Sequence, residues 1–348
     1  MKKTIILVFL IFQVFMFPQK RELSFQLADY KSLDSLVSFR GIFAVDKNIV
    51  WVSGSKGSVY VTDNGGKKWE KKKVPQGDSL EFRDIEVISP RTIVLMSVGV
   101  GKNSRIYKST DNGKSWKIVY QNNYLDGFLD TIEFWDKKDG IAIGDPINGK
   151  FNILLTNDGG NSWKEPPGKS IPAAFPGEAQ FAASGTCISV IGKKEAWIGT
   201  GGTISRILKT TDIGESWTVV KSPILQGKSS TGIFSIHFAD EHTGIIVGGD
   251  YLHEKNTDST SAFSDDGGKT WTLDSSGNLP YQSAVKSVKI NNKMLFLSTG
   301  PAGTYYTNSL KNWKIAEKTG FHCMSISQSD NSIWLAGSNG RVSKLVIK

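Results

Sequence analysis

The chain has 348 residues, of which 39% are hydrophobic, and this is enough to bury a sizeable core and to exclude a disordered protein. Only Cys187 and Cys323 occur, which excludes a scaffold held by disulfides. The formal net charge is +9, but the basic residues are spread along the chain and the aromatic residues do not interleave with them, so we expect no nucleic-acid partner.

The N-terminus has the pattern of a secretory signal. Lys2 and Lys3 precede an apolar run from Ile5 to Phe17, and Pro18 then breaks it. The run is too short to cross a bilayer comfortably, and it lacks the alternation of a half-buried strand. We therefore predict a signal peptide at residues 1–18, a periplasmic or secreted protein, and no membrane span in the remainder.

Short runs of strand type follow this segment, and no apolar stripe at helical spacing lasts beyond a turn or two. The first run is at residues 24–28, and the next three, at 39–45, 49–54 and 58–62, end in the turn phrase TDNGGKKW at 62–69. In such a turn, glycine supplies positive φ, Ser/Thr and Asp side chains bond backbone amides, and the Trp packs between neighbouring sheets.

The turn phrase recurs along the chain. Its six copies are at residues 62–69, 109–116, 156–163, 210–217, 264–271 and 307–313, and their tryptophans are separated by 47, 47, 54, 54 and 42 residues. A period in the forties, built from strand-like runs, is typical of a propeller blade with four strands. The Asp residues of the phrase are therefore interpreted as turn-capping groups and not as metal ligands or catalytic acids.

The tail, residues 321–347, contains three strand-like runs without a turn phrase, so an N-terminal strand must complete the last sheet. We predict an all-β chain, a seven-bladed β-propeller of four-stranded antiparallel blades over residues 23–348, closed by an N-terminal strand in the last blade. Seven blades over this range average about 47 residues each, which agrees with the observed spacing. We expect a monomer.

The repeated phrase resembles the Asp-box, or bacterial neuraminidase repeat. Together with GDP at 144–146, FAASGT at 181–186 and GFH at 320–322, the spacing is similar to that of exported propellers grouped with the photosystem II stability/assembly factor family. The resemblance covers the whole mature chain and is specific for fold, whereas it leaves activity open because Asp-boxes occur in sialidases, xyloglucanases, sorting receptors and assembly factors. The first copy has Asn64 in place of the box Asp, and the sixth lacks its glycine, so we expect these turns to be the least regular.

Functional residues are expected on the face opposite the Asp-boxes. In an antiparallel blade, second-to-third turns and blade-to-blade crossings share this face, and two such segments, 164–185 and 248–262, are unusually long. The long segments and the shorter loops beside them place His253 and several other polar residues on one sector, which we interpret as a cleft. Arg40, Arg83 and His322 begin inner strands and are expected at the mouth of the central channel, where the arginines could bind a carboxylate or phosphate group. The alternative is that these three residues pair with Asp84, Asp130 or loop carbonyls. The candidate binding residues are Arg40, Arg83, Asp145, Glu178, Ser184, Arg206, Asp250, Tyr251 and His322.

Two functions remain open. The first is a binding or assembly module that offers its loop-rich face to a protein or glycan partner, as the resemblance to assembly factors implies. The second is a glycoside hydrolase of sialidase or xyloglucanase type, in which Asp145, Glu178 and Asp250 would supply the carboxylate pair. With four His and two distant Cys we expect no metal, and without a Gly-rich strand-to-helix loop we expect no cofactor.

Overall fold

The computed structural model describes residues 23–166 and 171–348, and the predicted signal peptide at residues 1–18 lies outside the described residues. The described residues form strands β1 to β29 and two short 3₁₀ turns, η1 (Gly101–Asn103) and η2 (Ser338–Gly340). Among these residues, no helix has the length and apolarity needed to cross a membrane. The all-β prediction is confirmed.

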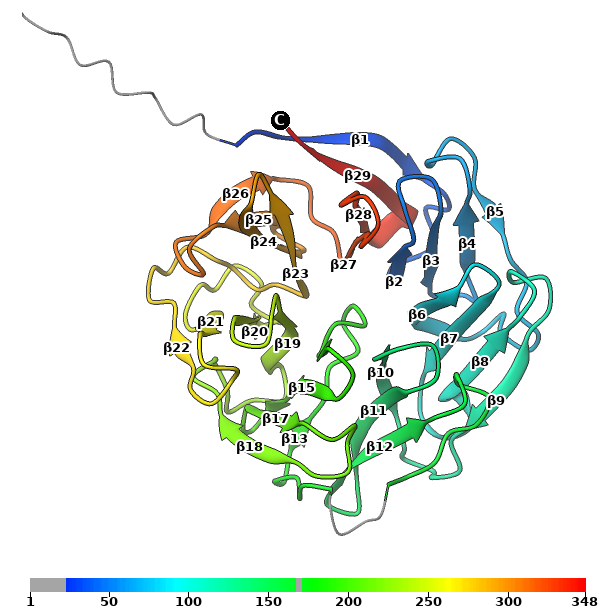
Figure 1. The fold of residues 1–348 in the computed structure, drawn as a ribbon, viewed down its shortest axis with the longest axis horizontal. Coiled ribbons are helices and arrows are strands. Elements are labelled where there is room, and N and C mark those ends of the chain that lie inside the picture. Colours follow the sequence, from blue (N-terminus) through cyan, green and yellow to red (C-terminus); the bar gives the residue numbers. More distant parts are fainter. Residues whose placement is uncertain (1–22, 167–170) are drawn as a thin grey trace, which may run out of the picture.

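The strands form seven sheets arranged in a ring around a central axis, which confirms the predicted seven-bladed propeller (Figure 1). Blade I contains β2 (Phe39–Ala44), β3 (Val50–Gly54), β4 (Val59–Thr62) and β5 (Glu70–Lys71), and blade II contains β6 (Glu81–Ser89), β7 (Thr92–Val98), β8 (Arg105–Ser109) and β9 (Lys117–Gln121). Blade III contains β10 (Leu129–Phe134), β11 (Gly140–Ile147) and β12 (Lys150–Thr156), and blade IV contains β14 (Ile188–Ile191), β15 (Glu195–Gly199), β17 (Arg206–Thr210) and β18 (Thr218–Lys221). Blade V contains β19 (Thr231–Phe238), β20 (Gly244–Asp250), β21 (Ser261–Ser264) and β22 (Thr272–Leu273), and blade VI contains β23 (Ala284–Ile290), β24 (Lys293–Gly300), β25 (Gly303–Thr307) and β26 (Lys314–Glu317).

Blades III and V depart from the simple four-stranded pattern. In blade III a single bridge, Leu155 to Lys164, stands where the other blades have an outer strand. Blade V is extended on its inner side by β16 (Gly201–Gly202) and β13 (Glu178–Ala179). Only glycine permits this attachment, because a Cβ added to Gly232 would lie 2.3 Å from the Cα of Gly201.

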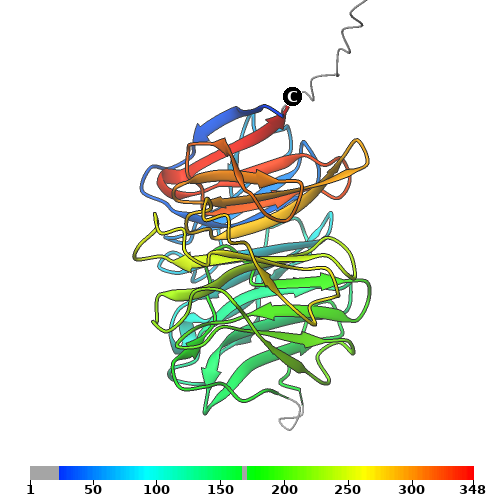
Figure 2. The same ribbon diagram turned by 90° about the vertical axis from the view of Figure 1, so that its left-hand side faces the viewer.

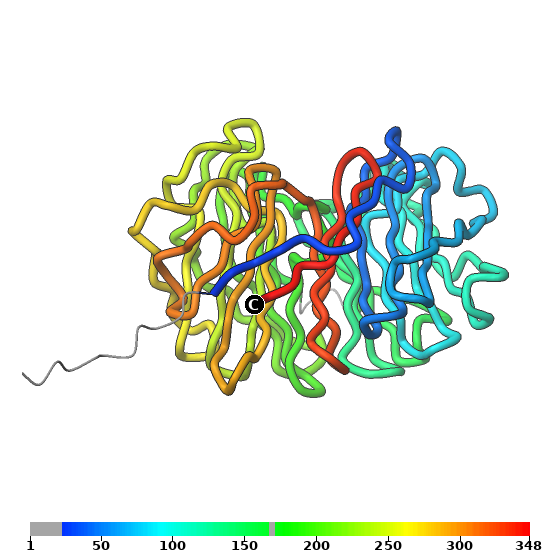
Figure 3. The backbone as a smooth tube through the Cα atoms, turned by 90° about the horizontal axis from the view of Figure 1, so that it is seen from above, coloured from blue at the N-terminus to red at the C-terminus, as the bar shows by residue number. Residues whose placement is uncertain are grey.

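Blade VII combines the two ends of the described chain. It contains β27 (Cys323–Ile326), β28 (Ile333–Ala336), β29 (Arg341–Ile347) and, as its outer strand, β1 (Phe25–Ser32). The strands β1 and β29 are antiparallel, with Phe25 opposite Ile347, and they lie side by side at one end of the molecule in Figure 2. Figure 3 shows both strands crossing the outer wall of the ring.

The core lies between blades. The described residues contain seven apolar clusters that each join two neighbouring blades, from the cluster of Trp51 and Phe82 between blades I and II to the cluster of Phe39 and Trp334 between blades I and VII. Alternate residues of each middle strand point to opposite seams, which explains the near-continuous apolar runs of these strands. An eighth, smaller cluster is separate and lies at one mouth of the channel.

The repeated turns connect the third and fourth strands and have the predicted chemistry. In the third copy, Thr156 Oγ1 accepts a hydrogen bond from the Gly160 amide, and Asp158 Oδ1 accepts bonds from the amides of Asn161 and Ser162. The glycine also meets the neighbouring blade: in the fifth copy, a Cβ on Gly268 would lie 2.7 Å from Trp197 Nε1. The turn is repeated because the blade is repeated.

The two divergent copies of the turn differ from each other. The first keeps the main bond, from the Gly66 amide to Thr62 Oγ1 at 2.9 Å, although Asn64 Oδ1 accepts only one backbone bond, from Lys68. The sixth is one residue shorter, and Thr307 Oγ1 instead donates to the Lys311 carbonyl. The turn therefore tolerates loss of the carboxylate alone, whereas the sixth copy, which lacks the carboxylate, the glycine and one residue, has a different bond pattern.

Candidate functional site

A cavity of about 440 Å³ lies at the channel mouth opposite the Asp-box turns. Its lining comes from all seven blades or the crossings between them. The residues that line the cavity therefore meet only because the chain closes into a ring. The lining residues are Arg40, Arg83, Phe128, Asp130, Asp145, Gln180, Phe181, Ala182, Ala183, Phe234, Tyr251, Glu254, Tyr281, Pro301 and His322. We refer to this cavity as the mouth pocket.

The basic side of the mouth pocket comes from the first residues of the inner strands or just before them. Arg40 Nη1 donates to the Ala183 carbonyl at 3.3 Å, and Arg83 Nη1 donates to the Ala182 carbonyl at 2.9 Å. Arg83 also pairs with Glu81 at 2.9 Å. Burial and the charge of Arg83 lower the pKa of Arg40, while burial and the charge of Arg40 lower the pKa of His322 to about 3. His322 is therefore neutral near pH 7.

The acidic side comes from blade III. Asp130 is buried, and burial together with the nearby carboxyl of Asp145 raises the pKa of Asp130 well above its ordinary value. Burial also raises the pKa of Asp145, although its Oδ1 accepts a hydrogen bond from the Gln180 amide at 2.9 Å. Two adjacent carboxyl groups with raised pKa values favour a state in which at least one keeps its proton.

An aromatic wall stands beside these polar groups. Phe181 and Phe234 stack with ring centroids 3.9 Å apart, and Tyr281 meets Phe234 edge-on at 4.9 Å. Tyr251 also contacts Phe234 edge-on, at 6.0 Å, and is 44% exposed at the rim. The wall can therefore offer an apolar surface to a ligand, with Tyr251 as its accessible edge.

Several buried polar atoms of the mouth pocket have no hydrogen-bond partner among the described residues. They belong to four residues that reach the pocket from different segments: Arg40 Nε, Asp130 Oδ2, both amide atoms of Gln180, and His322 Nδ1. Asp130 and Gln180 are 1% and 3% exposed, so bulk water does not surround these side chains. Buried polar groups are normally bonded, and their concentration at one site is typical of a place where a ligand or ordered water binds.

Glu178 and Arg206 form a buried ion pair outside the mouth pocket. Arg206 donates from Nε to Glu178 Oε1 at 2.8 Å and from Nη2 to Oε2 at 2.6 Å. Thr200 and the Phe175 amide donate to the same carboxylate, and the Arg206 guanidinium lies over the Phe175 ring at 4.7 Å. The pair ties the long crossing at 164–185 to blade IV, and its satisfied partners give it a structural role.

The other candidates also lie apart. Asp250 accepts bonds from the Leu252 amide and from His253 Nδ1, the latter at 2.8 Å, and it lines a separate hollow near Lys228. Ser184 is buried and bonds to Thr186 and the Ser283 carbonyl. The expected single cleft across three blades is therefore not what the structure has.

The mouth pocket brings together five of the nine candidates, namely Arg40, Arg83, Asp145, Tyr251 and His322. Sequence reasoning did not select Gln180, Phe181, Phe234 or Tyr281, which complete the pocket. Phe234 could have been selected from the sequence, because it lies near the start of an inner strand, β19, as the arginine candidates do on theirs. The others lie on crossings, whose path depends on tertiary contacts.

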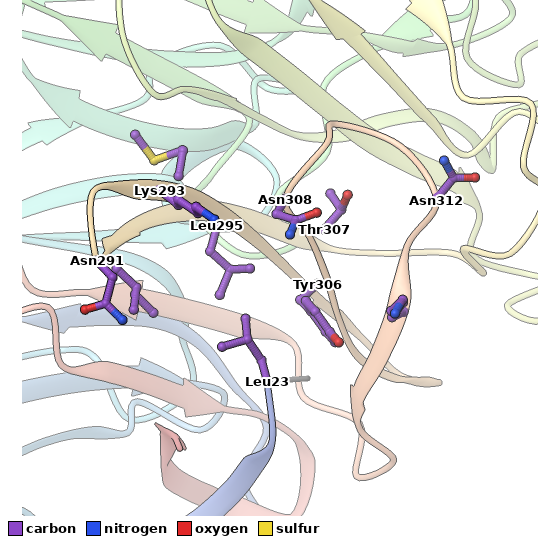
Figure 4. Close-up of a pocket in the computed structure, with 11 residues that line it drawn as sticks. Leu23, Asn291, Lys293, Leu295, Tyr306, Thr307, Asn308 and Asn312 are labelled. Atoms are coloured by element: carbon purple, nitrogen blue, oxygen red, sulfur yellow. The ribbon is translucent and has the colours of Figure 1, made fainter. Parts of the chain in front are cut away.

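A larger cavity, of about 530 Å³, lies on the Asp-box side of blade VI (Figure 4). Leu23, Leu295 and Tyr306 line it with several asparagines and lysines. In other blades the box glycine of the next blade covers the middle strand, as Gly66 does with Trp334 and Gly113 with Trp51. Blade VII has no such turn, and this leaves blade VI less covered.

No group of three or more His, Cys, Asp or Glu able to hold a metal ion occurs within residues 23–166 and 171–348. Cys187 and Cys323 are free and buried in the core.

The seven sheets and the repeated turn define the chain as a seven-bladed Asp-box β-propeller. Residues 262–273 match the family of the BNR/Asp-box repeat. Two solved structures resemble it in fold: YCF48 bound to D1 peptide, with 14% identity, a TM-score of 0.61 and coverage of 91% of this chain and 94% of that chain, and YCF48 from Cyanidioschyzon merolae, with 14% identity, a TM-score of 0.60 and coverage of 92% and 98%. No curated protein matches the sequence. The predicted resemblance to an Asp-box propeller of the assembly-factor type is thus confirmed for the fold.

Proposed function

We propose that this protein is a binding module that receives a segment of a protein partner at the mouth pocket. The observation that carries the proposal is the group of unbonded polar atoms from Arg40, Asp130, Gln180 and His322 in one cavity. A rigid ring holds these groups in place, and such pre-organisation reduces the cost of binding. The similar fold of YCF48, one structure of which is described as bound to D1 peptide, supports a peptide ligand.

The arrangement of acids favours binding over glycoside hydrolysis. Of the three carboxylates that the hydrolase hypothesis would use, Glu178 is sealed against Arg206, Asp250 lines a different hollow, and only Asp145 lines the mouth pocket. A glycosidase needs two carboxyl groups that face one groove across the scissile bond. Asp130 lies near Asp145 but is 1% exposed.

We also propose that the protein is exported. The charged and apolar pattern of residues 1–18 supports export to the periplasm or beyond, where the protein would act as a monomer. A glycan is the alternative ligand class, because aromatic side chains beside polar groups also suit sugars.

The test is binding of the mature chain to an array of amidated peptides and to a glycan array, repeated with Tyr251→Ala and Tyr30→Ala. Both tyrosines are about half exposed, but Tyr251 lies at the rim of the mouth pocket and Tyr30 lies on β1. We expect Tyr251→Ala to weaken peptide binding about tenfold, as for an aromatic hot spot, and Tyr30→Ala to leave it unchanged. Equal binding by both variants would place the site elsewhere, and retention on glycans alone would change the ligand class.

A further inference from the structure

Arg40 lines the mouth pocket, and the Nε and Nη2 edge of its guanidinium group is unused within the described residues. Of its three nitrogens only Nη1 donates a hydrogen bond within the described residues, to the Ala183 carbonyl. Nε is buried and unbonded, and no carboxylate of the described chain lies within ion-pair distance of Arg40. A half-buried cation without a counter-charge is unfavourable, so this edge is where a ligand can gain most.

The chain itself shows what this edge of an arginine can hold. In Arg206 the same two nitrogens, Nε and Nη2, grip both oxygens of the Glu178 carboxylate at 2.8 and 2.6 Å. This side-on geometry is the fork that makes arginine suitable for planar carboxylates. Arg40 has the same fork, but without an internal carboxylate.

The surroundings of Arg40 favour a negative group. Arg83 adds a second positive charge, and His322 is neutral near pH 7 and has an unbonded ring nitrogen. The charge of Glu81 raises the pKa of Arg40, but Glu81 is itself paired with Arg83 at 2.9 Å. The other carboxyl groups that line the pocket, Asp130, Asp145 and Glu254, form no ion pair with Arg40 within the described residues.

An apolar surface begins next to this basic group. Tyr281 is 4% exposed and lies close enough to Arg40 to raise the pKa of that side chain. The Tyr281 ring also contacts Phe234. Phe234 in turn contacts Phe181 and the exposed Tyr251. A ligand that fills both parts must carry a carboxylate close to an apolar side chain.

We propose that the mouth pocket recognises a carboxylate adjoining an apolar side chain, with Arg40 holding the carboxylate side-on and the aromatic wall holding the apolar group. This inference rests on the proposed function and specifies the partner's chemistry. The carboxylate can come from a chain end or from an Asp or Glu side chain.

The experiment measures fluorescence anisotropy of three labelled peptides with the mature chain. The probes are Gly-Gly-Gly-Gly-Phe with a free C-terminal carboxylate, the same peptide as its amide, and amidated Gly-Gly-Asp-Phe-Gly. The variants are Arg40→Met and the matched control Arg91→Met, which removes the same charge from an exposed turn on the Asp-box face. Circular dichroism verifies that both variants fold.

We expect at least one carboxylate peptide to bind at least tenfold more tightly than the simple amide, and Arg40→Met to remove this preference while Arg91→Met keeps it. Preference for the first probe identifies a chain end, and preference for the third identifies an acidic side chain. Equal affinity of all three probes, no binding by any, or a preference that survives Arg40→Met would overturn the inference. The wider proposal is judged separately, because the array peptides are amidated and their binding is tested through Tyr251.

Discussion

The carboxyl groups of the Asp-box turns and those of the mouth pocket have opposite environments. On the Asp-box face, hydrogen bonds from Ser162, Thr156 and Asn161 outweigh the effect of burial and lower the pKa of Asp158 to about 2. At the mouth, burial and a second carboxyl raise the pKa of Asp130, and one of its oxygens is unbonded. The repeated residues of the turns bond to one another, whereas several polar residues of the mouth pocket keep unbonded atoms that a ligand can use.

The largest expected effect comes from Glu178, a carboxylate on the mouth face whose two oxygens are both bonded. Glu178→Gln should reduce the free energy of unfolding by about 3 kcal/mol or more, because it leaves the largely buried Arg206 without its counter-charge. The measurement is urea unfolding followed by tryptophan fluorescence.

The matched control is Asp29→Asn. Asp29 also forms an ion pair, with Lys344 at 3.1 Å, but the two side chains are 46% and 22% exposed, so neither charge is left buried and the expected loss is below about 1 kcal/mol. Similar losses in both variants would mean that the Glu178–Arg206 pair does not stabilise the contact between the crossing at 164–185 and blade IV.

An intermediate effect concerns the pH dependence of the free energy of unfolding, to which Asp158 and Asp130 should contribute with opposite sign. The unfolded Asp158 has a pKa near 3.8 and the folded one a pKa of about 2, so its contribution is complete above about pH 4 and is lost as the pH falls toward 2. The raised pKa of Asp130 has the opposite sign: the folded chain keeps a proton that the unfolded chain releases, so stability falls as the pH rises from about 4.

Asp158→Asn should therefore cost about 1 kcal/mol at pH 7 and progressively less at low pH. Asp130→Asn should gain stability relative to the natural chain as the pH rises from 4 to 7. Urea unfolding of both variants at pH 3, 4, 5.5 and 7 tests these slopes. Slopes of the same sign would remove the contrast between the faces.

The smallest effect concerns the first Asp-box copy. Asn64→Asp should raise the free energy of unfolding by at most about 0.5 kcal/mol, because a carboxylate strengthens the bond from the Lys68 amide but no hydroxyl stands at position 68. The thermal midpoint at low salt is the readout. A decrease would show that the asparagine itself suits this turn.

The sequence predicted the fold well because six copies of one turn report the same local structure. It also predicted that Arg40, Arg83 and His322 would lie at one mouth, since each is within the first three residues of an inner strand or immediately precedes one. The sequence did not show that Glu178 and Asp250 lie outside the mouth pocket. The crossing at 164–185 and the loop at 248–262 are held by tertiary contacts, and the repeat spacing carries no information about such contacts. Residues such as Gln180 and Tyr281 had no local signal.

The pairing of β1 with β29 joins segments separated by more than 300 residues. Six blades can in principle assemble from neighbouring segments, but the seam of the seventh must wait until the last strand has been synthesised and has found the first. Contacts of such sequence separation slow folding and leave strand edges exposed in the meantime. Because β1 is synthesised first and its partner β29 last, β1 stays unpaired until synthesis is nearly complete. During this time chaperones and proteases can bind the unfinished ring.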